Sequence, residues 1–152
     1  GNKLAAYNHI NKNERRILVI GDLHAPFELD GYFDFCKQTY ANYNCNQVIY
    51  IGDCLDNHFS SYHNSDPNGL GGGDELEFAI ERLQKWSREF PVADVLIGNH
   101  DRIIMRKAFD SAIPKVWIKS YNDVLGTNWN WTERIVYDNV QFVHGGQRQK
   151  MT

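Results

Sequence analysis

Three short runs of apolar residues, rich in valine and isoleucine, each pass directly into a glycine that is followed by Asp or Asn. The runs are Ile17–Ile20 before Gly21-Asp22, Val48–Ile51 before Gly52-Asp53, and Val95–Ile97 before Gly98-Asn99. A run that is apolar on both faces is typical of a strand buried in a parallel sheet, and a glycine directly after it favours a strand over a helix. The pattern therefore predicts three buried parallel strands.

The segments between these runs carry apolar residues at helical spacing. We expect one helix within Leu29–Tyr43. A second helix is expected from an N-cap at Asp74, with Glu77 three residues on, to a point just before Pro91. The order strand–helix–strand–helix–strand predicts right-handed crossovers and an α/β fold in which helices are layered on a parallel sheet.

The rest of the chain is less regular. The expected elements are a helix over Arg102–Phe109, a short helix over Pro114–Tyr121, and strands over Thr132–Tyr137 and Val140–Val143. The two strands are expected to form a hairpin around Asp138-Asn139, and Asp101 is expected to be the N-cap of the helix that follows it. Trp129 and Trp131 alternate, so they share one face of any strand; core packing is the commoner fate of such a pair, and base stacking is the alternative.

The composition indicates a single globular domain. The chain has 152 residues, of which 42% are apolar and 23% charged, and its formal charge is −3. This charge excludes a strong overall field for nucleic acid but leaves room for a local patch. The apolar runs are too short to span a bilayer and no signal peptide is expected, so we expect a cytoplasmic location. The expected organisation is a flexible segment over residues 1–14, a domain over residues 15–146 and a tail over residues 147–152.

Polar side chains gather where the predicted strands end. In open α/β sheets, ligands bind beyond the carboxyl ends of the strands. The side chains at or just past these ends are Asp22, His24, Asp53, Asp56, Asn99, His100 and, after the last predicted strand, His144. Carboxylates packed together repel one another, and divalent cations resolve this conflict. Mixed oxygen and imidazole ligands suit Mn²⁺, Fe or Zn²⁺, and two cations that share a carboxylate are the usual device for phosphoryl transfer.

Four sequence blocks at these strand ends resemble those of the calcineurin-like metallophosphoesterases. The blocks are Asp22-Leu23-His24, Gly52-Asp53-Cys54-Leu55-Asp56, Gly98-Asn99-His100-Asp101 and Val143-His144-Gly145, in the family's order within residues 15–146. The resemblance implies a metallophosphoesterase-type layered β-sandwich flanked by helices. The family's closing Gly-His-x-His block does not occur in this sequence. We therefore expect the C-terminal strands of the fold to be missing and each metal to have three protein ligands.

The resemblance also implies a role for each polar side chain. The implied ligands are Asp22 and His24 for a first metal, Asp53 for both metals, and Asn99 and His144 for the second. His100 would be the general acid or would bind the phosphate, and Asp56 would be the carboxylate that orients it. The implied cofactors are two divalent ions, with Mn²⁺ preferred and Fe, Zn²⁺, Ni²⁺ or Mg²⁺ as alternatives.

Arg102 and Asn57 are candidate substrate contacts. Asn57-His58 stands where Ser/Thr protein phosphatases of this superfamily have Arg-Gly, so the chain resembles compact phosphodiesterases or phosphatases, including phage versions, more closely. A phage-encoded chain would act in the host cytoplasm.

The implied function is hydrolysis of a phosphodiester or phosphomonoester, with nucleotides or nucleic acid as candidate partners. The implied mechanism is direct attack of metal-bound hydroxide in a two-metal site. The alternatives are a non-catalytic or degenerate module that binds a phosphate or a partner, and an inactive fragment of a longer phosphoesterase.

Overall fold

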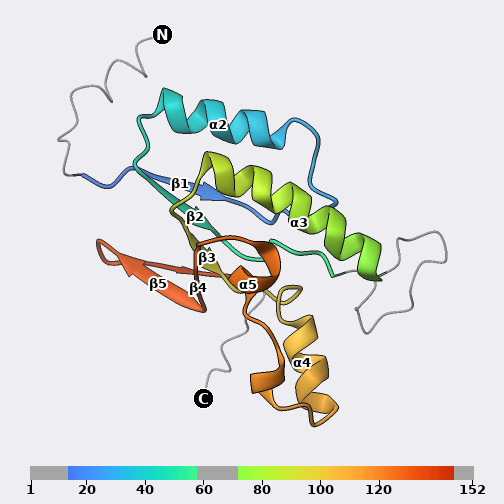
Figure 1. Cartoon of the computed structure of the whole chain (residues 1–152). Helices are drawn as coiled ribbons and strands as arrows, with labels where there is room; N and C mark the ends of the chain where they lie inside the picture. The colour runs from blue at the N-terminus through green and yellow to red at the C-terminus, as the bar shows by residue number, and fades with distance from the viewer. Residues whose placement is uncertain (1–13, 58–71, 146–152) are drawn as a thin grey trace.

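Four parallel strands form the central sheet of the protein. The computed structural model describes residues 14–57 and 72–145 (Figure 1). The strands are β1 (Ile17–Ile20), β2 (Gln47–Tyr50), β3 (Asp94–Leu96) and β4 (Asn130–Thr132), and they lie side by side in that order. Helices α2 (Tyr32–Asn42) and α3 (Gly72–Glu89) connect the first three strands, as parallel pairing requires. The predicted α/β fold is confirmed, with β2 and β3 each beginning one residue earlier than expected.

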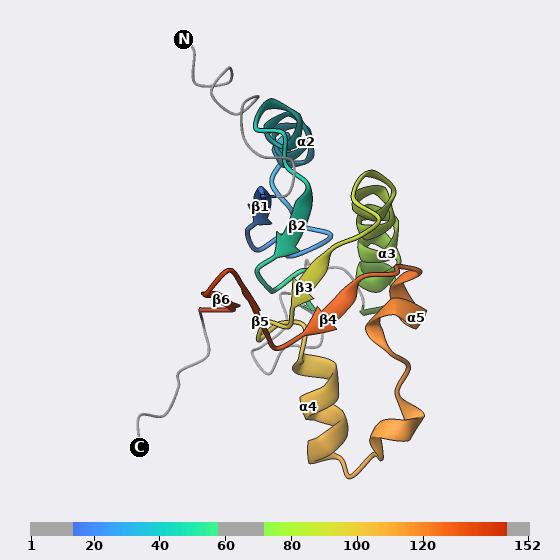
Figure 2. The ribbon, with the colours of Figure 1, turned by 90° about the vertical axis from the view of Figure 1, so that its left-hand side faces the viewer.

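The core of the protein lies between the sheet and these two helices. Both helices lie on one side of the sheet (Figure 2). Trp86 of α3 is 1% exposed, and its rings contact Phe33 of α2 and Tyr50 of β2, with centroids 5.0 and 6.2 Å away. Large aromatic side chains bury much apolar area, so this cluster fastens both helices to the sheet.

The start of α3 differs from the prediction. The helix begins at Gly72, so Asp74 is not its N-cap but lies in its first turn. An acidic side chain in that position is favourable because it faces the positive end of the helix dipole. The other end is as expected, since α3 stops at Glu89 shortly before Pro91.

The region after β3 contains more, and shorter, elements than the sequence indicated. They are α4 (Ile103–Asp110), a 3₁₀ turn η1 (Lys115–Trp117) and α5 (Tyr121–Leu125). The single short helix expected over Pro114–Tyr121 is therefore wrong. The chain leaves the helical region at Ile118, and Ser120 starts a new helix by accepting a hydrogen bond from the Asp123 backbone at 3.2 Å.

The last two strands form a separate antiparallel hairpin. They are β5 (Arg134–Tyr137) and β6 (Val140–Val143), joined by Asp138 and Asn139 as predicted. These two residues have φ values of 50° and 66°, which a two-residue hairpin turn needs and which Asp and Asn tolerate better than most residues. The expected longer strand from Thr132 is wrong in one respect, because Thr132 ends β4 of the central sheet.

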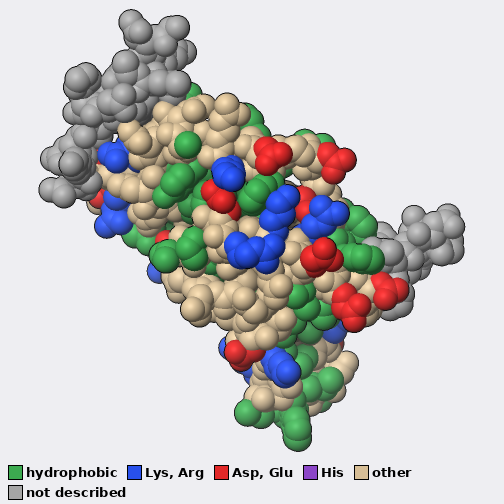
Figure 3. Space-filling view, turned by 45° about the horizontal axis from the view of Figure 1, so that its top comes forward, with side chains coloured by type: hydrophobic (Ala, Val, Ile, Leu, Met, Phe, Trp, Pro, Cys, Tyr) green, Lys and Arg blue, Asp and Glu red, His purple; other side chains and the backbone are tan. Residues whose placement is uncertain are grey.

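The surface over the helices mixes both signs of charge, and hydrophobic side chains gather at the tip formed by α4 and η1 (Figure 3). Phe109, Val116 and Trp117 are between 78% and 89% exposed at this tip. No helix within the described residues is long and apolar enough to cross a membrane. The segments expected to be a flexible start and a tail, apart from Glu14, lie outside the described residues.

Candidate metal centre

The loops after β1 and β2 run side by side beyond the ends of their strands. The backbone N–H of His24 donates to the Asp53 carbonyl at 2.9 Å, and that of Ala25 donates to the Cys54 carbonyl at 2.8 Å. The backbone N–H of Asp56 returns a hydrogen bond to the Ala25 carbonyl at 3.0 Å. The parallel pairing of the strands thus continues into the loops, and it fixes the spacing between His24, Asp53 and Asp56.

Two glycines let the loops approach one another closely. Gly52 has a φ of 118°, and a Cβ built on it would overlap the ring of His144. A Cβ on Gly98 would overlap both the carboxylate and the backbone nitrogen of Asp53. Glycine at these two positions therefore serves contact between loops, and Gly52 also needs a conformation that other residues rarely adopt.

One group of candidate ligands consists of Asp22, Asp53 and His144. Their ligand atoms lie within 4.8 Å of one another. His144 Nε2 is 3.1 Å from Asp53 Oδ2 and 3.6 Å from Asp22 Oδ1. The Asp53 side chain is only 6% exposed, whereas that of Asp22 is 42% exposed. The group thus contains one buried carboxylate, that of Asp53, and one that faces solvent, that of Asp22.

His24 faces the same carboxylates with one ring nitrogen. Its Nε2 lies 3.8 Å from Asp22 Oδ2 and 3.9 Å from Asp53 Oδ2, and its Nδ1 is 2.9 Å from Asp56 Oδ1. A carboxylate only accepts hydrogen bonds, so in the neutral ring Nδ1 carries the proton and Nε2 has the lone pair that a metal would need. A histidine that binds a metal through one nitrogen and donates its other N–H to a carboxylate is the usual arrangement in metal sites.

A second group consists of His24, Asp56 and His100. The Asp56 backbone carbonyl accepts a hydrogen bond from His100 Nδ1 at 2.6 Å, while its carboxylate Oδ1 is 3.8 Å from the same nitrogen. The rings of His24 and His100 meet edge to face, with centroids 4.7 Å apart. Asp56 therefore contacts both histidines, by its carboxylate at His24 and by its carbonyl at His100.

The backbone of His100 also supports the buried carboxylate. Its N–H donates to Asp53 Oδ1 at 2.8 Å. The other carboxylate oxygen of Asp53, Oδ2, is the one that faces His24 and His144. Asp53 is thus oriented by the loop after β3, with one oxygen fixed and the other directed between two imidazoles.

Asp101 joins the loops after β2 and β3, although it was expected to be a helix N-cap. Helix α4 begins at Ile103 and has no side-chain cap. Asp101 is instead completely buried, and its two oxygens accept hydrogen bonds from the backbone of Leu55 and of Gly98, each at 2.9 Å. Burial raises the pKa of this carboxyl to about 6, and the backbone hydrogen bonds oppose the rise. No sequence pattern indicates this role, because the hydrogen-bond partners of Asp101 are backbone groups of two different loops.

The other predicted site residues lie at the edge of these groups. Asn57 donates from its side-chain amide to the His100 carbonyl at 2.7 Å. The Arg102 guanidinium contacts Glu133 at 3.3 Å and the Ile97 carbonyl at 3.3 Å. Asn99 lies in the turn after β3 with an exposed side chain, and no described contact places it beside His144.

The donor set fits divalent cations. Two carboxylates and two imidazoles, Asp22, Asp53, His24 and His144, face a common space from three loops. Without a cation, the buried carboxylate of Asp53 held close to that of Asp22 is unfavourable, and mixed oxygen and imidazole donors suit the later first-row metals. The tautomer that Asp56 imposes on His24 points to the same conclusion.

A family model described as calcineurin-like phosphoesterase matches residues 15–151, which is well over half of the chain. No curated protein and no solved structure gives a significant match.

Proposed function

This chain belongs to the calcineurin-like phosphoesterase family, and from that premise we propose that it hydrolyses a phosphoester with two divalent metal ions. Membership of the family supports a metal-dependent phosphoesterase in general. The observation that carries the finer proposal is the position of Asp53, whose Oδ2 lies 3.9 Å from His24 Nε2 and 3.1 Å from His144 Nε2. A carboxylate between two imidazoles is suited to bridge two metals.

In this proposal one metal is held by Asp22, His24 and Asp53, and the second by Asp53, Asn99 and His144. The metals, when bound, supply positive charge that offsets the phosphate and acidify a water near neutral pH. Asp22 Oδ1 lies 3.6 Å from His144 Nε2, so Asp22 would also be available as a ligand of the second metal. Mn²⁺ is the preferred ion, since it accepts both oxygen and imidazole donors.

His100 is proposed as the general acid that protonates the leaving oxygen. Its Nδ1 faces a carbonyl oxygen, which only accepts, so Nδ1 carries a proton in every state. The exchangeable proton is therefore on Nε2, which is the atom that would serve the leaving group. Asp56 acts here as a positioning residue, because its carbonyl fixes the orientation of the His100 ring.

Asn57 and Arg102 are proposed to shape the substrate side of the centre. Asn57 holds the His100 loop by its amide, and Arg102 is 27% exposed beside the same turn. A guanidinium at that position suits contact with phosphate oxygens. The substrate is a phosphodiester or a phosphomonoester, and the assay below distinguishes the two.

The test combines metal content with hydrolysis. After removal of metals and reconstitution with Mn²⁺, elemental analysis should give close to two ions per chain, and the protein should hydrolyse bis-p-nitrophenyl phosphate or p-nitrophenyl phosphate. Asp53→Asn should lose both metals and turnover, whereas Asp34→Asn, the same change in the first turn of α2, should lose neither.

Two results would contradict the proposal. Turnover in Asp53→Asn equal to that of the unaltered protein would show that the centre is elsewhere. Metal binding without hydrolysis of either ester would favour the alternative, a module that binds phosphate or a partner without catalysis.

A further inference from the structure

A large cavity lies beside the metal centre, beneath α4, η1 and α5. Its volume is about 1170 Å³, which is more than the roughly 300–1,000 Å³ of ordinary small-molecule pockets. Its walls come from α4, η1, α5 and β4, and Leu76 of α3 also lines it. Of its lining residues, only Asn57 and Arg102 have a role in the function proposed above.

The cavity borders the loops that carry the metal centre. Asn57 lines the cavity and also donates to the His100 carbonyl at 2.7 Å. Leu55 and Asp101 line it as well, and they belong to the two loops that hold Asp53. A substrate that extends from the metals past Asn57 would therefore enter this cavity with the group attached to its phosphate.

The lining of the cavity is positively charged although the whole chain is negative. The charged lining residues are four cations, Arg102, Arg106, Lys115 and Lys119, and two anions, Asp101 and Glu133. The anions are both engaged, Asp101 by backbone hydrogen bonds and Glu133 by Arg102. Among the described residues, Lys115 and Lys119 form no ion pair. These charges favour a ligand with several negative groups.

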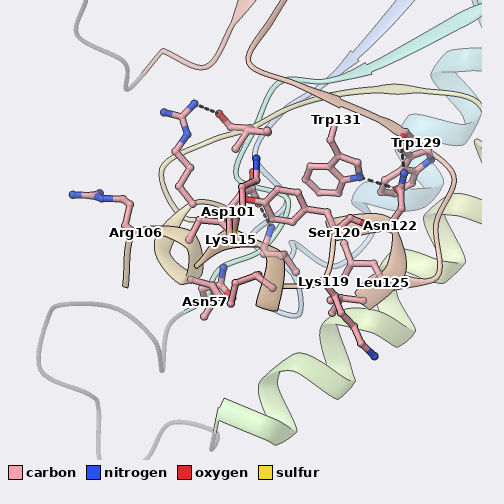
Figure 4. A pocket seen from close by; sticks show the side chains of 18 of the residues that line it. Asn57, Asp101, Arg106, Lys115, Lys119, Ser120, Asn122, Leu125, Trp129 and Trp131 are labelled. Atoms are coloured by element: carbon pink, nitrogen blue, oxygen red, sulfur yellow. Dashed lines mark hydrogen bonds between the residues drawn. The ribbon is translucent and has the colours of Figure 1, made fainter. Parts of the chain in front are cut away.

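Aromatic side chains form one end of the cavity. The rings of Tyr121 and Trp131 are stacked, with centroids 4.4 Å apart and an angle of 19° between their planes. Both are held by hydrogen bonds, from the Tyr121 hydroxyl to the Asp101 carbonyl at 2.7 Å and from Trp131 Nε1 to Asn122 Oδ1 at 2.9 Å. Figure 4 shows Trp129 and Trp131 at one end of the cavity and Arg106 at the other.

We propose that this cavity binds the unpaired nucleotides next to the scissile phosphodiester of a single-stranded polynucleotide. Lysines along a groove track a phosphate backbone, and fixed aromatic rings offer planar surfaces against which bases stack. The cavity has room for more than one nucleotide, which a lone phosphate or a small ester does not need. The proposal rests on the proposed function, because it takes the metal centre as the place of cleavage.

The test uses a fluorescein-labelled single-stranded oligothymidylate, with metals removed for the binding measurements. The double variant Lys115→Ala/Lys119→Ala should weaken binding about tenfold, since exposed charge contacts are individually modest. The slope of log affinity against log salt should fall in magnitude by about 1 to 2, because two phosphate contacts are lost. With Mn²⁺ restored, the loss of oligonucleotide cleavage should exceed any loss of bis-p-nitrophenyl phosphate hydrolysis by about the same factor as the loss of binding.

The control is Lys37→Ala/Arg88→Ala, which removes the same charge from the outer surfaces of α2 and α3. It should leave the affinity, the salt slope and both hydrolyses unchanged. Equal weakening by the two double variants would overturn the proposal, because it would show a general charge effect. Binding of a phosphopeptide or of anionic vesicles in preference to the oligonucleotide would also overturn it.

The two proposals fail in distinguishable ways. Hydrolysis of bis-p-nitrophenyl phosphate by a protein that does not bind the oligonucleotide would overturn the cavity proposal and leave the phosphoesterase proposal standing. Specific oligonucleotide binding that depends on Lys115 and Lys119, in a protein without any hydrolysis, would support the cavity as a nucleic-acid site and contradict the phosphoesterase proposal.

Discussion

The loops after β2 and β3 begin with similar residues, but the polar side chain is buried in one loop and exposed in the other. Each has a glycine followed by a short polar residue, Gly52-Asp53 in one and Gly98-Asn99 in the other. Asp53 is 5% exposed and has a φ of 49°, whereas Asn99 is an exposed turn residue. The same local pattern therefore gives a buried acceptor in one loop and a surface side chain in the other.

The difference arises from what each loop packs against. The loop after β3 lies over Asp53, with Gly98 in contact with its backbone and the His100 N–H bound to its carboxylate. The carboxylate of Asp101 also joins the two loops, because it accepts hydrogen bonds from the backbone of Leu55 and of Gly98. One loop thus supplies the central ligand and the other supplies the backbone that holds it, which is a division of roles that a residue pattern does not reveal.

The largest effect is expected from filling the contact between the two loops. In Gly98→Ala the new methyl group would overlap Asp53, so the loops must separate, and we expect a loss of about 3 kcal/mol in unfolding free energy together with loss of Mn²⁺ binding and turnover. The control is Gly73→Ala in α3, where nothing lies within 4 Å of the added Cβ. That change should stabilise the protein by about 0.5–1 kcal/mol. Thermal unfolding and metal analysis of both variants check the prediction, and a fully active Gly98→Ala would contradict it.

The next prediction distinguishes the role of the His100 side chain from the role of its backbone N–H. Because the His100 N–H is what holds Asp53, His100→Ala should keep both metals. Turnover should fall about 10²–10⁴-fold if the ring is a general acid. The fall should be larger for an ester with a poorly leaving alcohol than for a p-nitrophenyl ester, since p-nitrophenolate leaves without a proton. Equal losses for both esters would assign the ring to phosphate binding instead.

The central sheet was predictable because its evidence is local. The first apolar run coincides with β1, the other two lie within one residue of β2 and β3, and the crossover helices follow from the parallel order. β4 was missed because it is an isolated strand of three residues, with Trp131 at its centre and Trp129 just before it, and its partner β3 lies far away in sequence. Trp129 is 2% exposed and donates to the Phe90 carbonyl at 2.8 Å, so core packing is the correct choice for this residue.

The candidate site was predictable only as a set of residues. Ligands of open α/β sheets bind beyond the strand ends, and the structure places Asp22, Asp53 and His144 close together there. Their roles as metal ligands stay predictions. How each side chain is used depends on backbone partners in other loops, such as the carbonyl of Asp56 at His100. Asp101 shows the limit most clearly, because its hydrogen-bond partners are N–H groups, which every residue except proline possesses.

Because the buried carboxyl of Asp101 joins the two loops, we predict that the stability of the metal-free protein depends on pH. Burial raises the pKa of Asp101 to about 6, so on raising the pH the carboxyl ionises first in the unfolded chain. Its contribution to stability is therefore fully present below its ordinary pKa of 3.8 and is lost as the pH rises through about 6. A pKa rise of about two units corresponds to about 3 kcal/mol.

The substitution Asp101→Asn removes the titratable carboxyl and replaces one of its two hydrogen-bond acceptor oxygens. In EDTA at about pH 4 the variant should be less stable than the unaltered protein, and the gap should narrow by up to about 3 kcal/mol toward neutral pH. Urea unfolding across that range measures the gap, with the exposed Asp34→Asn as control for the lost charge. A gap that is constant or widens with pH would contradict the prediction.

The smallest effect on stability is expected from Asn99, the exposed residue of the loop after β3. Asn99 has an exposed side chain, so Asn99→Ala should change the unfolding free energy by less than about 0.5 kcal/mol. Because Asn99 is a proposed ligand of the second metal, Asn99→Ala should nevertheless lower the affinity for one of the two Mn²⁺ ions. We expect a loss of at least about 10–100-fold, which is the loss caused by removing a residue that only supports a ligand. Calorimetric titration with Mn²⁺ checks this, with Asn42→Ala at the end of α2 as the matched control. Two unchanged binding events would remove Asn99 from the centre and leave Asp22, which lies 3.6 Å from His144, to complete the second site.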